Sequence, residues 1–177
     1  MKELLAMLGR NLLFVLIAIT VTVIVYGIYT SQPKPRVVQS QPAAEYKLAA
    51  AGPLTSFQQT FNFGTISMAG GKVSHTYTIN NSGTNTVRVT KLFTSCMCTE
   101  ATLITSDGRA GPFGMAGHGY IPNIAVPIRH GENATVEIIF DPAAHGPAGV
   151  GRIDRVITLQ TDAGQPLELA FTAMVKP

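Results

Sequence analysis

Residues 73–93, VSHTYTINNSGTNTVRVTKLF, decide the fold class of this chain. Val73, His75, Tyr77 and Ile79 fall on one face of an extended segment, while serine and threonine occupy the other. This period of two is typical of a β-strand with one buried face. NNSGT then supplies turn residues, and TVRVTKLF resumes the alternation. We therefore expect two strands that run in opposite directions and are joined by a short turn.

The same pattern recurs along the chain after residue 50. Alternating or short apolar segments predict strands at residues 57–63, 73–79, 86–93, 124–128, 134–140, 153–161 and 167–175. No stretch in this part has the period of a long amphipathic helix. Short strands separated by Gly, Pro and Asn turns predict an all-β, immunoglobulin-like antiparallel β-sandwich of about seven strands.

The beginning of the chain has a different composition. Residues 12–29, LLFVLIAITVTVIVYGIY, contain no charged side chain and are long enough to cross a bilayer as a helix. Lys2 and Arg10 precede this run, which favours a cytoplasmic N-terminus. The sequence thus predicts an N-terminal membrane anchor helix (1–30), a Pro/Ala/Gln-rich linker (31–52) and the sandwich domain (53–177). A cleaved signal peptide is the alternative interpretation of the first segment.

Charge and topology together predict the setting of the protein. The net charge is only +3 and no run of Lys or Arg is present, so a nucleic-acid partner is not expected. We expect a single-pass membrane protein whose C-terminal domain lies in the periplasm or outside the cell. The expected partners are the membrane, through the N-terminal helix, and another envelope protein.

The two cysteines of the chain, Cys96 and Cys98, are separated by one residue in TSCMCTEA. An oxidising compartment permits a disulfide, which would close a very small ring. Free thiols packed as small apolar side chains and a pair of metal ligands are the other two interpretations. The spacing alone does not distinguish them, because the answer depends on which other residues the fold brings to the pair.

Strand direction predicts which residues those are. If the strands run alternately up and down, both cysteines leave the third strand at one end of the sandwich. The loops expected at the same end carry Met115, His118 and His145, whereas His130 falls in a turn at the opposite end. His75 lies on the inward face of its strand, where a hydrogen-bonded histidine at the core edge is the expected role.

Sulfur and imidazole at one place are typical of a metal site. Thiolate and thioether ligands suit copper(I), and two thiolates with two imidazoles would also form a tetrahedral zinc site. The predicted ligands are Cys96, Cys98, His118 and His145, with Met115 as a soft auxiliary ligand. Copper is the expected metal and zinc the alternative.

Four ordered motifs, FNFGTI, GGKVSHTYTINNSG, SCMCTEA and GENATVEIIFDP, resemble the bacterial envelope domain-of-unknown-function family 1573. The resemblance covers roughly residues 57–175. It implies an immunoglobulin-like sandwich, similar to that of major-sperm-protein-type domains, in an envelope setting with no settled activity. This chain differs in having Met97 where glycine is common, and in a long insertion over residues 102–129.

The sequence predicts a protein that binds rather than catalyses. It has no G-x-S-x-G elbow and no H-E-x-x-H zinc motif. The leading hypothesis is an envelope-facing binding module that holds or delivers copper. One alternative is a structural or protein-interaction subunit whose cysteines form a disulfide or stay as buried thiols, and another is a thiol–disulfide exchange partner.

Overall fold

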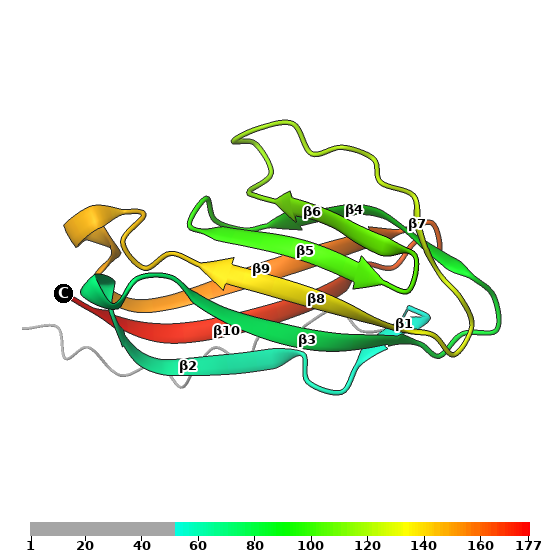
Figure 1. The fold of residues 1–177 in the computed structure, drawn as a ribbon, viewed down its shortest axis with the longest axis horizontal. Coiled ribbons are helices and arrows are strands. Elements are labelled where there is room, and N and C mark those ends of the chain that lie inside the picture. Colours follow the sequence, from blue (N-terminus) through cyan, green and yellow to red (C-terminus); the bar gives the residue numbers. More distant parts are fainter. Residues whose placement is uncertain (1–51) are drawn as a thin grey trace, which may run out of the picture. The chain divides into compact units, whose positions relative to one another are not determined.

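The computed structural model describes residues 52–177, which form a sandwich of two five-stranded β-sheets with two short 3-10 helices (Figure 1). The predicted all-β, immunoglobulin-like class is confirmed, although these residues contain ten strands rather than about seven. The predicted anchor helix, and all but the last residue of the predicted linker, lie outside the described residues. Between residues 52 and 177, no helix has the length and apolar character that a membrane span requires.

The two sheets divide the strands as follows. Sheet one has the order β1 (Leu54–Ser56), β3 (Val73–Asn81), β8 (Asn133–Phe140), β5 (Thr99–Thr105) and β6 (Gly108–Phe113). Sheet two has the order β2 (Thr60–Ser67), β10 (Leu167–Lys176), β9 (Gly151–Thr161), β4 (Val87–Thr94) and β7 (Val126–Ile128). The 3-10 helices are η1 (Met68–Gly70) and η2 (Gly146–Gly149). Neighbouring strands are antiparallel except β2 and β10, which are parallel.

The first predicted strand, 57–63, corresponds to β2, which begins later than predicted, and the unpredicted strand β1 precedes it in the other sheet. β1 pairs with β3 in sheet one, and β2 pairs with β10 in sheet two. The predicted range 57–63 therefore covers the crossing between the sheets and the beginning of β2. Near this crossing, the Ala170 N–H donates to the Gln59 carbonyl oxygen at 2.8 Å. A single stretch of chain thus forms an edge of both sheets.

The predicted insertion at 102–129 also contains regular structure. β5 pairs with β8 from Thr99 opposite Phe140 to Ile104 opposite Thr135, and β6 returns alongside β5. β5 completes the buried side of sheet one with Ala101 and Leu103, both almost fully buried. The β6 sequence, GRAGPF, lacks the alternation that marks a strand, so only its pairing with β5 defines it. This hairpin explains most of the difference in strand number.

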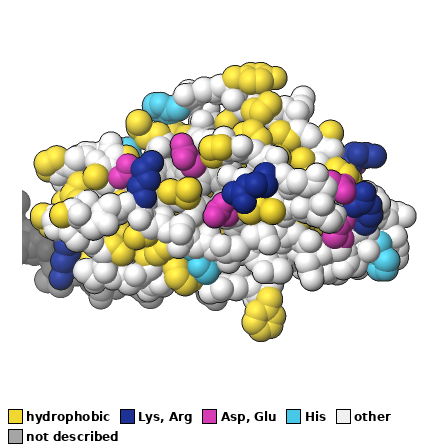
Figure 2. Space-filling view, viewed as in Figure 1, with side chains coloured by type: hydrophobic (Ala, Val, Ile, Leu, Met, Phe, Trp, Pro, Cys, Tyr) yellow, Lys and Arg dark blue, Asp and Glu magenta, His cyan; other side chains and the backbone are white. Residues whose placement is uncertain are grey.

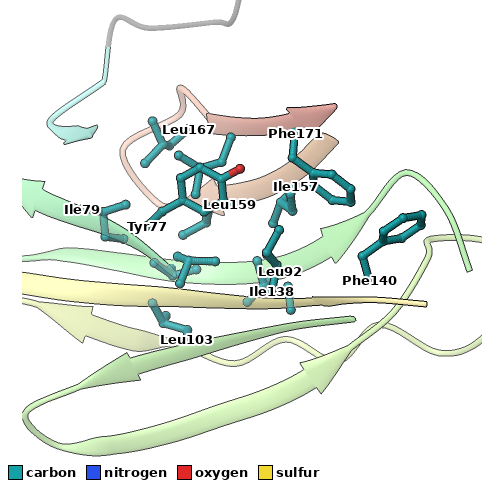
Figure 3. Packing of buried hydrophobic residues seen from close by; sticks show 14 of the residues in the cluster. Tyr77, Ile79, Leu92, Leu103, Ile138, Phe140, Ile157, Leu159, Leu167 and Phe171 are labelled. Carbon is teal, nitrogen blue, oxygen red and sulfur yellow. The ribbon is translucent and has the colours of Figure 1, made fainter. Parts of the chain in front are cut away.

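The core lies between the sheets and runs continuously toward the cysteines. Figure 3 shows apolar side chains of both sheets facing one another, with Phe140 and Phe171 close together. Their ring centroids are 5.3 Å apart. Tyr77 is buried in the same core, where its hydroxyl donates to the Ala170 carbonyl at 2.7 Å and where burial raises its pKa. Both cysteines belong to this cluster, so the sulfur pair closes one end of the core.

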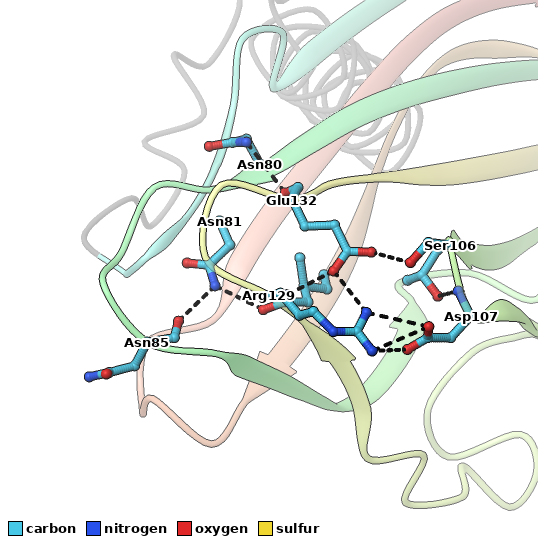
Figure 4. A network of polar contacts seen from close by, with 9 residues as sticks. Asn80, Asn81, Asn85, Ser106, Asp107, Arg129 and Glu132 are labelled. Atoms are coloured by element: carbon cyan, nitrogen blue, oxygen red, sulfur yellow. Dashed lines mark hydrogen bonds and ion pairs between the residues drawn. The ribbon is translucent and has the colours of Figure 1, made fainter.

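The opposite end of the sandwich, called the polar end below, comprises the β3–β4, β5–β6 and β7–β8 turns (Figure 4). Arg129 contacts the Asp107 carboxylate at 3.1 Å and that of Glu132 at 3.5 Å. Asn81, which is fully buried, donates to the carbonyl oxygens of Asn85 and Ile128, each at 2.8 Å. These contacts tie the three turns together.

Charged side chains outside this network are dispersed. On the face shown in Figure 2, Lys and Arg side chains alternate with Asp and Glu rather than gathering in one patch of a single sign. This distribution matches the small net charge of the chain. This face therefore carries no broad surface of a single charge sign.

Candidate functional site

The turn between β4 and β5 carries both cysteines and is anchored on two sides. Thr94, at the end of β4, is buried, and its Oγ1 lies 2.9 Å from the carbonyl oxygens of Cys96 and Thr99. Ser95 contacts the neighbouring strand β9 twice, because its N–H donates to the Val156 carbonyl and its Oγ accepts from the Val156 N–H, both at 2.9 Å. The turn is therefore held in place before any contact of the sulfur atoms is counted.

Cys96 and Cys98 form a disulfide in this structure, with Cα atoms 5.3 Å apart. Of the three interpretations of the pair, the structure thus shows the crosslinked one. The two residues are 8% and 3% exposed, so Cys96 is the more accessible. Because a disulfide is converted to a dithiol by two electrons and two protons, reduction would turn the same residues into two neighbouring thiols.

His145 reaches the sulfur pair from the segment between β8 and β9. Its Nε2 lies 3.1 Å from Cys96 Sγ. The segment is fastened beside the cysteines because the Asp141 N–H donates to the Cys98 carbonyl at 2.9 Å, and the Asp141 carboxylate accepts from the Ala143 N–H at 2.9 Å. Asp141 thus makes the turn that carries His145. The residue His145 itself is exposed to solvent.

Arg155 is the site residue that sequence reasoning missed. Its Nε–H donates to Cys98 Sγ at 3.2 Å, and its Nη1 donates to the Asp154 carbonyl at 2.9 Å. Burial lowers the pKa of Arg155, and the charge of Asp154 opposes that shift. A signal was present in IDRVITLQT, because the alternation of β9 puts Arg155 on the inward side between Ile153 and Ile157. A charged residue at such a position needs a local partner.

Three of the predicted ligands are brought together. The sulfur atoms of Cys96 and Cys98 and a ring nitrogen of His145 all lie within 4.8 Å of one another. Among residues 52–177, this is the group of His, Cys, Asp and Glu side chains with the spacing of a metal site, and it does not include His118. Two thiolates and one imidazole match the preference of copper(I) for soft ligands, and of zinc for mixed sulfur and nitrogen.

The other predicted ligands lie nearby along the chain but in a different environment. Met115 is half-buried, and its backbone forms an isolated bridge with Thr94, beside the cysteine turn. His118 is exposed and follows Met115 in a turn where its N–H donates to the Met115 carbonyl at 3.3 Å. Met115 is thus placed at the sulfur end of the molecule, whereas the structure shows no contact between the His118 ring and the sulfur pair.

The remaining histidines are both outside the group. The His130 ring contacts the Gly83 carbonyl at the polar end, as strand direction predicted. His75 stacks on Phe61 with ring centroids 3.6 Å apart, and its buried Nε2 has no hydrogen-bond partner among the described residues. The expectation of a hydrogen-bonded core-edge histidine is therefore wrong for this nitrogen, because aromatic rings surround it instead.

The sulfur end, defined by Cys96, Cys98, His145 and Arg155, is accessible beside the disulfide. A hollow of about 530 Å³ is lined by His145, Arg152, Arg155 and neighbouring residues of η2 and β9. On another side, a smaller hollow of about 80 Å³ is lined by Cys98 and Met97 among others. The two groups that contact the sulfur atoms thus face a surface depression that can admit a ligand or a partner's side chain.

Residues 54–112 match the model of the family described as "Protein of unknown function (DUF1573)". The resemblance to DUF1573 is confirmed. The matched stretch includes both cysteines but ends before His145 and Arg155. The DUF1573 match therefore covers the turn that carries the sulfur atoms, while their two contacting side chains come from the later strands.

Comparison with curated proteins finds no match. Among solved structures, a protein of unknown function from Porphyromonas gingivalis W83 is 16% identical with a TM-score of 0.49, over 71% of this chain and 48% of that chain. The VesB protease of Vibrio cholerae is 19% identical with a TM-score of 0.45, over 69% of this chain and 32% of that chain.

A PapD-like domain of human CEP192 is 12% identical with a TM-score of 0.41, over 71% of this chain and 87% of that one. The present chain thus spans about half the length of the P. gingivalis protein and about a third of that of VesB. These likenesses carry no activity over to this chain.

Proposed function

We propose that this protein is a membrane-anchored, envelope-facing immunoglobulin-like module that binds copper(I) through Cys96, Cys98 and His145 in the reduced state. The observation that carries the proposal is the mutual approach of one ring nitrogen and two sulfur atoms within 4.8 Å at the end of the core. Copper(I) accepts two thiolates and an imidazole as ligands, and thiolates are among its preferred donors.

The surroundings of the group support a binding role. The turn that carries the cysteines is fixed to β9 through Ser95, and the segment that carries His145 is fixed to the same turn through Asp141. Ligands held in this way lose little conformational freedom when a metal binds. The burial of the two cysteines excludes most water from the sulfur side, while the exposure of His145 leaves a side open for exchange.

The disulfide makes binding conditional on redox state. A sulfur atom in a disulfide is not a thiolate ligand, so the crosslinked protein lacks two of its three donors. Reduction by a dithiol consumes the S–S bond and produces two thiols, which lose their protons when the metal binds. The module therefore binds copper(I) only after reduction, and oxidation of the pair releases it.

A titration of the full-length chain tests this proposal. The reduced protein should remove one copper(I) ion per chain from a chromogenic copper(I) chelator, and the oxidised protein should remove none. The variant Cys96→Ser/Cys98→Ser should bind none in either state. Arg129→Met, at the polar end, is the matched control and should behave as the wild type. Equal copper uptake by the double variant and the wild type would exclude these ligands.

A second function, thiol–disulfide exchange, is favoured by the contact of Arg155 with Cys98. A partner's thiolate attacks the more accessible sulfur, Cys96 Sγ, the S–S bond breaks, and Cys98 leaves as a thiolate beside the guanidinium. A second thiol of the partner then displaces Cys96 from the mixed disulfide. The partner dithiol is oxidised by two electrons and the Cys96–Cys98 pair is reduced by two.

Equilibration of the full-length chain with mixtures of oxidised and reduced glutathione tests this second function. A reduction potential within the range of envelope dithiols is expected if the pair exchanges with such a partner. A pair that stays oxidised in every mixture would exclude exchange as the function.

A further inference from the structure

In the described part of the chain, three arginines form ion pairs with carboxylates, whereas Arg155 contacts a sulfur atom instead. Arg109, Arg129 and Arg152 each lie within 4.0 Å of a carboxylate. No ion pair in residues 52–177 includes Arg155, although this side chain is half-buried. A partly desolvated guanidinium without a carboxylate partner is unfavourable, so its position against Cys98 calls for an explanation.

The neighbouring carboxylate of Asp154 acts on Arg155 through its charge but forms no ion pair with it. Both carboxylate oxygens of Asp154 accept from Arg152, at 3.0 and 3.2 Å, while Arg155 contacts only the backbone carbonyl of Asp154. The group that Arg155 does contact is the sulfur of Cys98. This sulfur is neutral in the disulfide and becomes negatively charged when the reduced cysteine binds a metal.

We propose that Arg155 is a specificity-determining residue, which makes the site select a monovalent over a divalent cation. This inference rests on the proposed copper site. Two thiolates contribute two negative charges, Arg155 contributes one positive charge, and a neutral imidazole contributes none. A monovalent ion brings the sum to zero, whereas a divalent ion leaves one uncompensated positive charge at a partly buried place.

The repulsion between the guanidinium and the metal acts in the same direction. Coulomb energy is proportional to the charge of the ion, so a divalent cation is repelled by Arg155 twice as strongly as a monovalent cation at the same place. Loss of the hydrogen bond from the Arg155 Nε–H to Cys98 Sγ would weaken the copper(I) complex and the zinc(II) complex alike, because both require the Cys98 thiolate. The ratio of the zinc(II) affinity to the copper(I) affinity therefore reports the effect of the Arg155 charge, because loss of the hydrogen bond lowers both affinities.

Of the other charged side chains near the sulfur pair, Arg152 and Asp154 are exposed and pair with each other. Lys72, Glu100 and Asp141 line the small hollow that also includes Cys98, but none of them hydrogen-bonds to a sulfur atom. Lys72 and Glu100 are exposed, so water and salt screen their influence. Arg155 thus stands out among these ionised groups in being both partly buried and in contact with a sulfur atom.

The test measures copper(I) and zinc(II) affinities of the full-length reduced chain by competition with chromogenic chelators. A phosphine keeps the cysteines reduced without adding thiols. In Arg155→Met, the affinity for zinc relative to copper(I) should rise by about tenfold or more, because one positive charge near the ion is lost. Arg155→Lys keeps the charge and should stay near the wild-type ratio. Arg129→Met, at the polar end, is the control and should also leave the ratio unchanged.

Arg155→Gln provides a second neutral variant with N–H donors, which keeps the test decisive if the methionine variant does not fold. An unchanged ratio in a folded neutral variant, with copper(I) still bound by the wild type, would overturn the selectivity role and leave the copper site standing. Absence of copper(I) binding by the reduced wild type would instead overturn the proposed function. A raised ratio in the neutral variants, restored by lysine, would establish the role of Arg155.

Discussion

At the polar end, Asn81 has partners for both its amide nitrogen and its amide oxygen, and Arg129 contacts two carboxylates (Figure 4). At the sulfur end, Arg155 has a sulfur atom in place of a carboxylate, and an imidazole approaches the other sulfur. Both ends close the same core, so burial alone does not explain the difference. A satisfied network stabilises a fold, whereas groups with incomplete partnerships are typical of a binding site.

The first way to sharpen this comparison is to remove the buried amide at the polar end. Asn81→Ala deletes hydrogen bonds to the Asn85 and Ile128 carbonyls and from the Gly83 N–H. We expect the free energy of unfolding to fall by about 3 kcal/mol, because buried polar groups lose their partners. Urea unfolding measures this loss. Copper(I) affinity of the folded fraction should not change, and a changed affinity would show that the two ends are coupled.

The second prediction separates the two loop histidines. His145→Ala should weaken copper(I) binding by about 10- to 100-fold or more. Loss of a side chain that only orients a metal ligand already lowers metal affinity by about 10- to 100-fold, and His145 is itself a proposed ligand. His118→Ala should leave the affinity near the wild type, since the group of three ligands does not include it. Chelator competition measures both variants. Equal losses in the two variants would place His118 among the ligands after all.

The third prediction concerns His75, which lies on β3 near the sulfur end and stacks on Phe61. Burial lowers the pKa of His75 from its ordinary value of 6.5. As the pH falls, this histidine therefore binds a proton more readily in the unfolded chain than in the folded chain. The free energy of unfolding should therefore decline as the pH falls below about 6.5, and His75→Phe should reduce this decline. Urea midpoints at neutral and mildly acidic pH measure it. An identical decline in the variant would assign the effect to other groups.

The smallest effect is expected from Glu132 at the polar end. Its pKa is lowered from 4.5, first by the hydrogen bond from Ser106 and then by the backbone N–H of Arg129. A lowered carboxyl pKa gives stability that is present above pH 4.5 and is lost as the pH falls through the folded value. Glu132→Gln should remove this part of the acid dependence. Because the Arg129 side of this ion pair is exposed, the pair adds little stability, and a large loss at neutral pH would contradict this account.

The alternation of short segments was enough to predict the sandwich and most of its strands, because a half-buried strand must present apolar residues at every second position. The short strand β1, and the change of sheet between β1 and β2, were not predictable in this way. The pattern of residues 57–63 marks only the start of β2, and the change of sheet depends on the pairing of β1 with β3 and of β2 with β10. The same holds for β6, whose sequence is weak and whose pairing with β5 is tertiary.

At the site, strand direction alone predicted that Cys96, Cys98 and His145 would share one end and that His130 would not. It did not distinguish His145 from His118, since both occur in glycine-rich loops that start or finish near that end. The structure separates them because Asp141 fastens one loop to the cysteine turn, whereas His118 lies exposed beyond Met115. Which loop folds back onto the turn is a property of tertiary hydrogen bonds.

The sequence by itself determined the layered β architecture and the place of the sulfur atoms at the end of a strand, because both follow from local periodicity. Only the tertiary structure decided that the cysteines are joined, that His145 is their imidazole, and that Arg155 stands against Cys98. Arg155 is 57 residues away from that cysteine in the chain. Contacts between residues so distant in sequence arise from sheet order and packing, which short-range patterns do not encode.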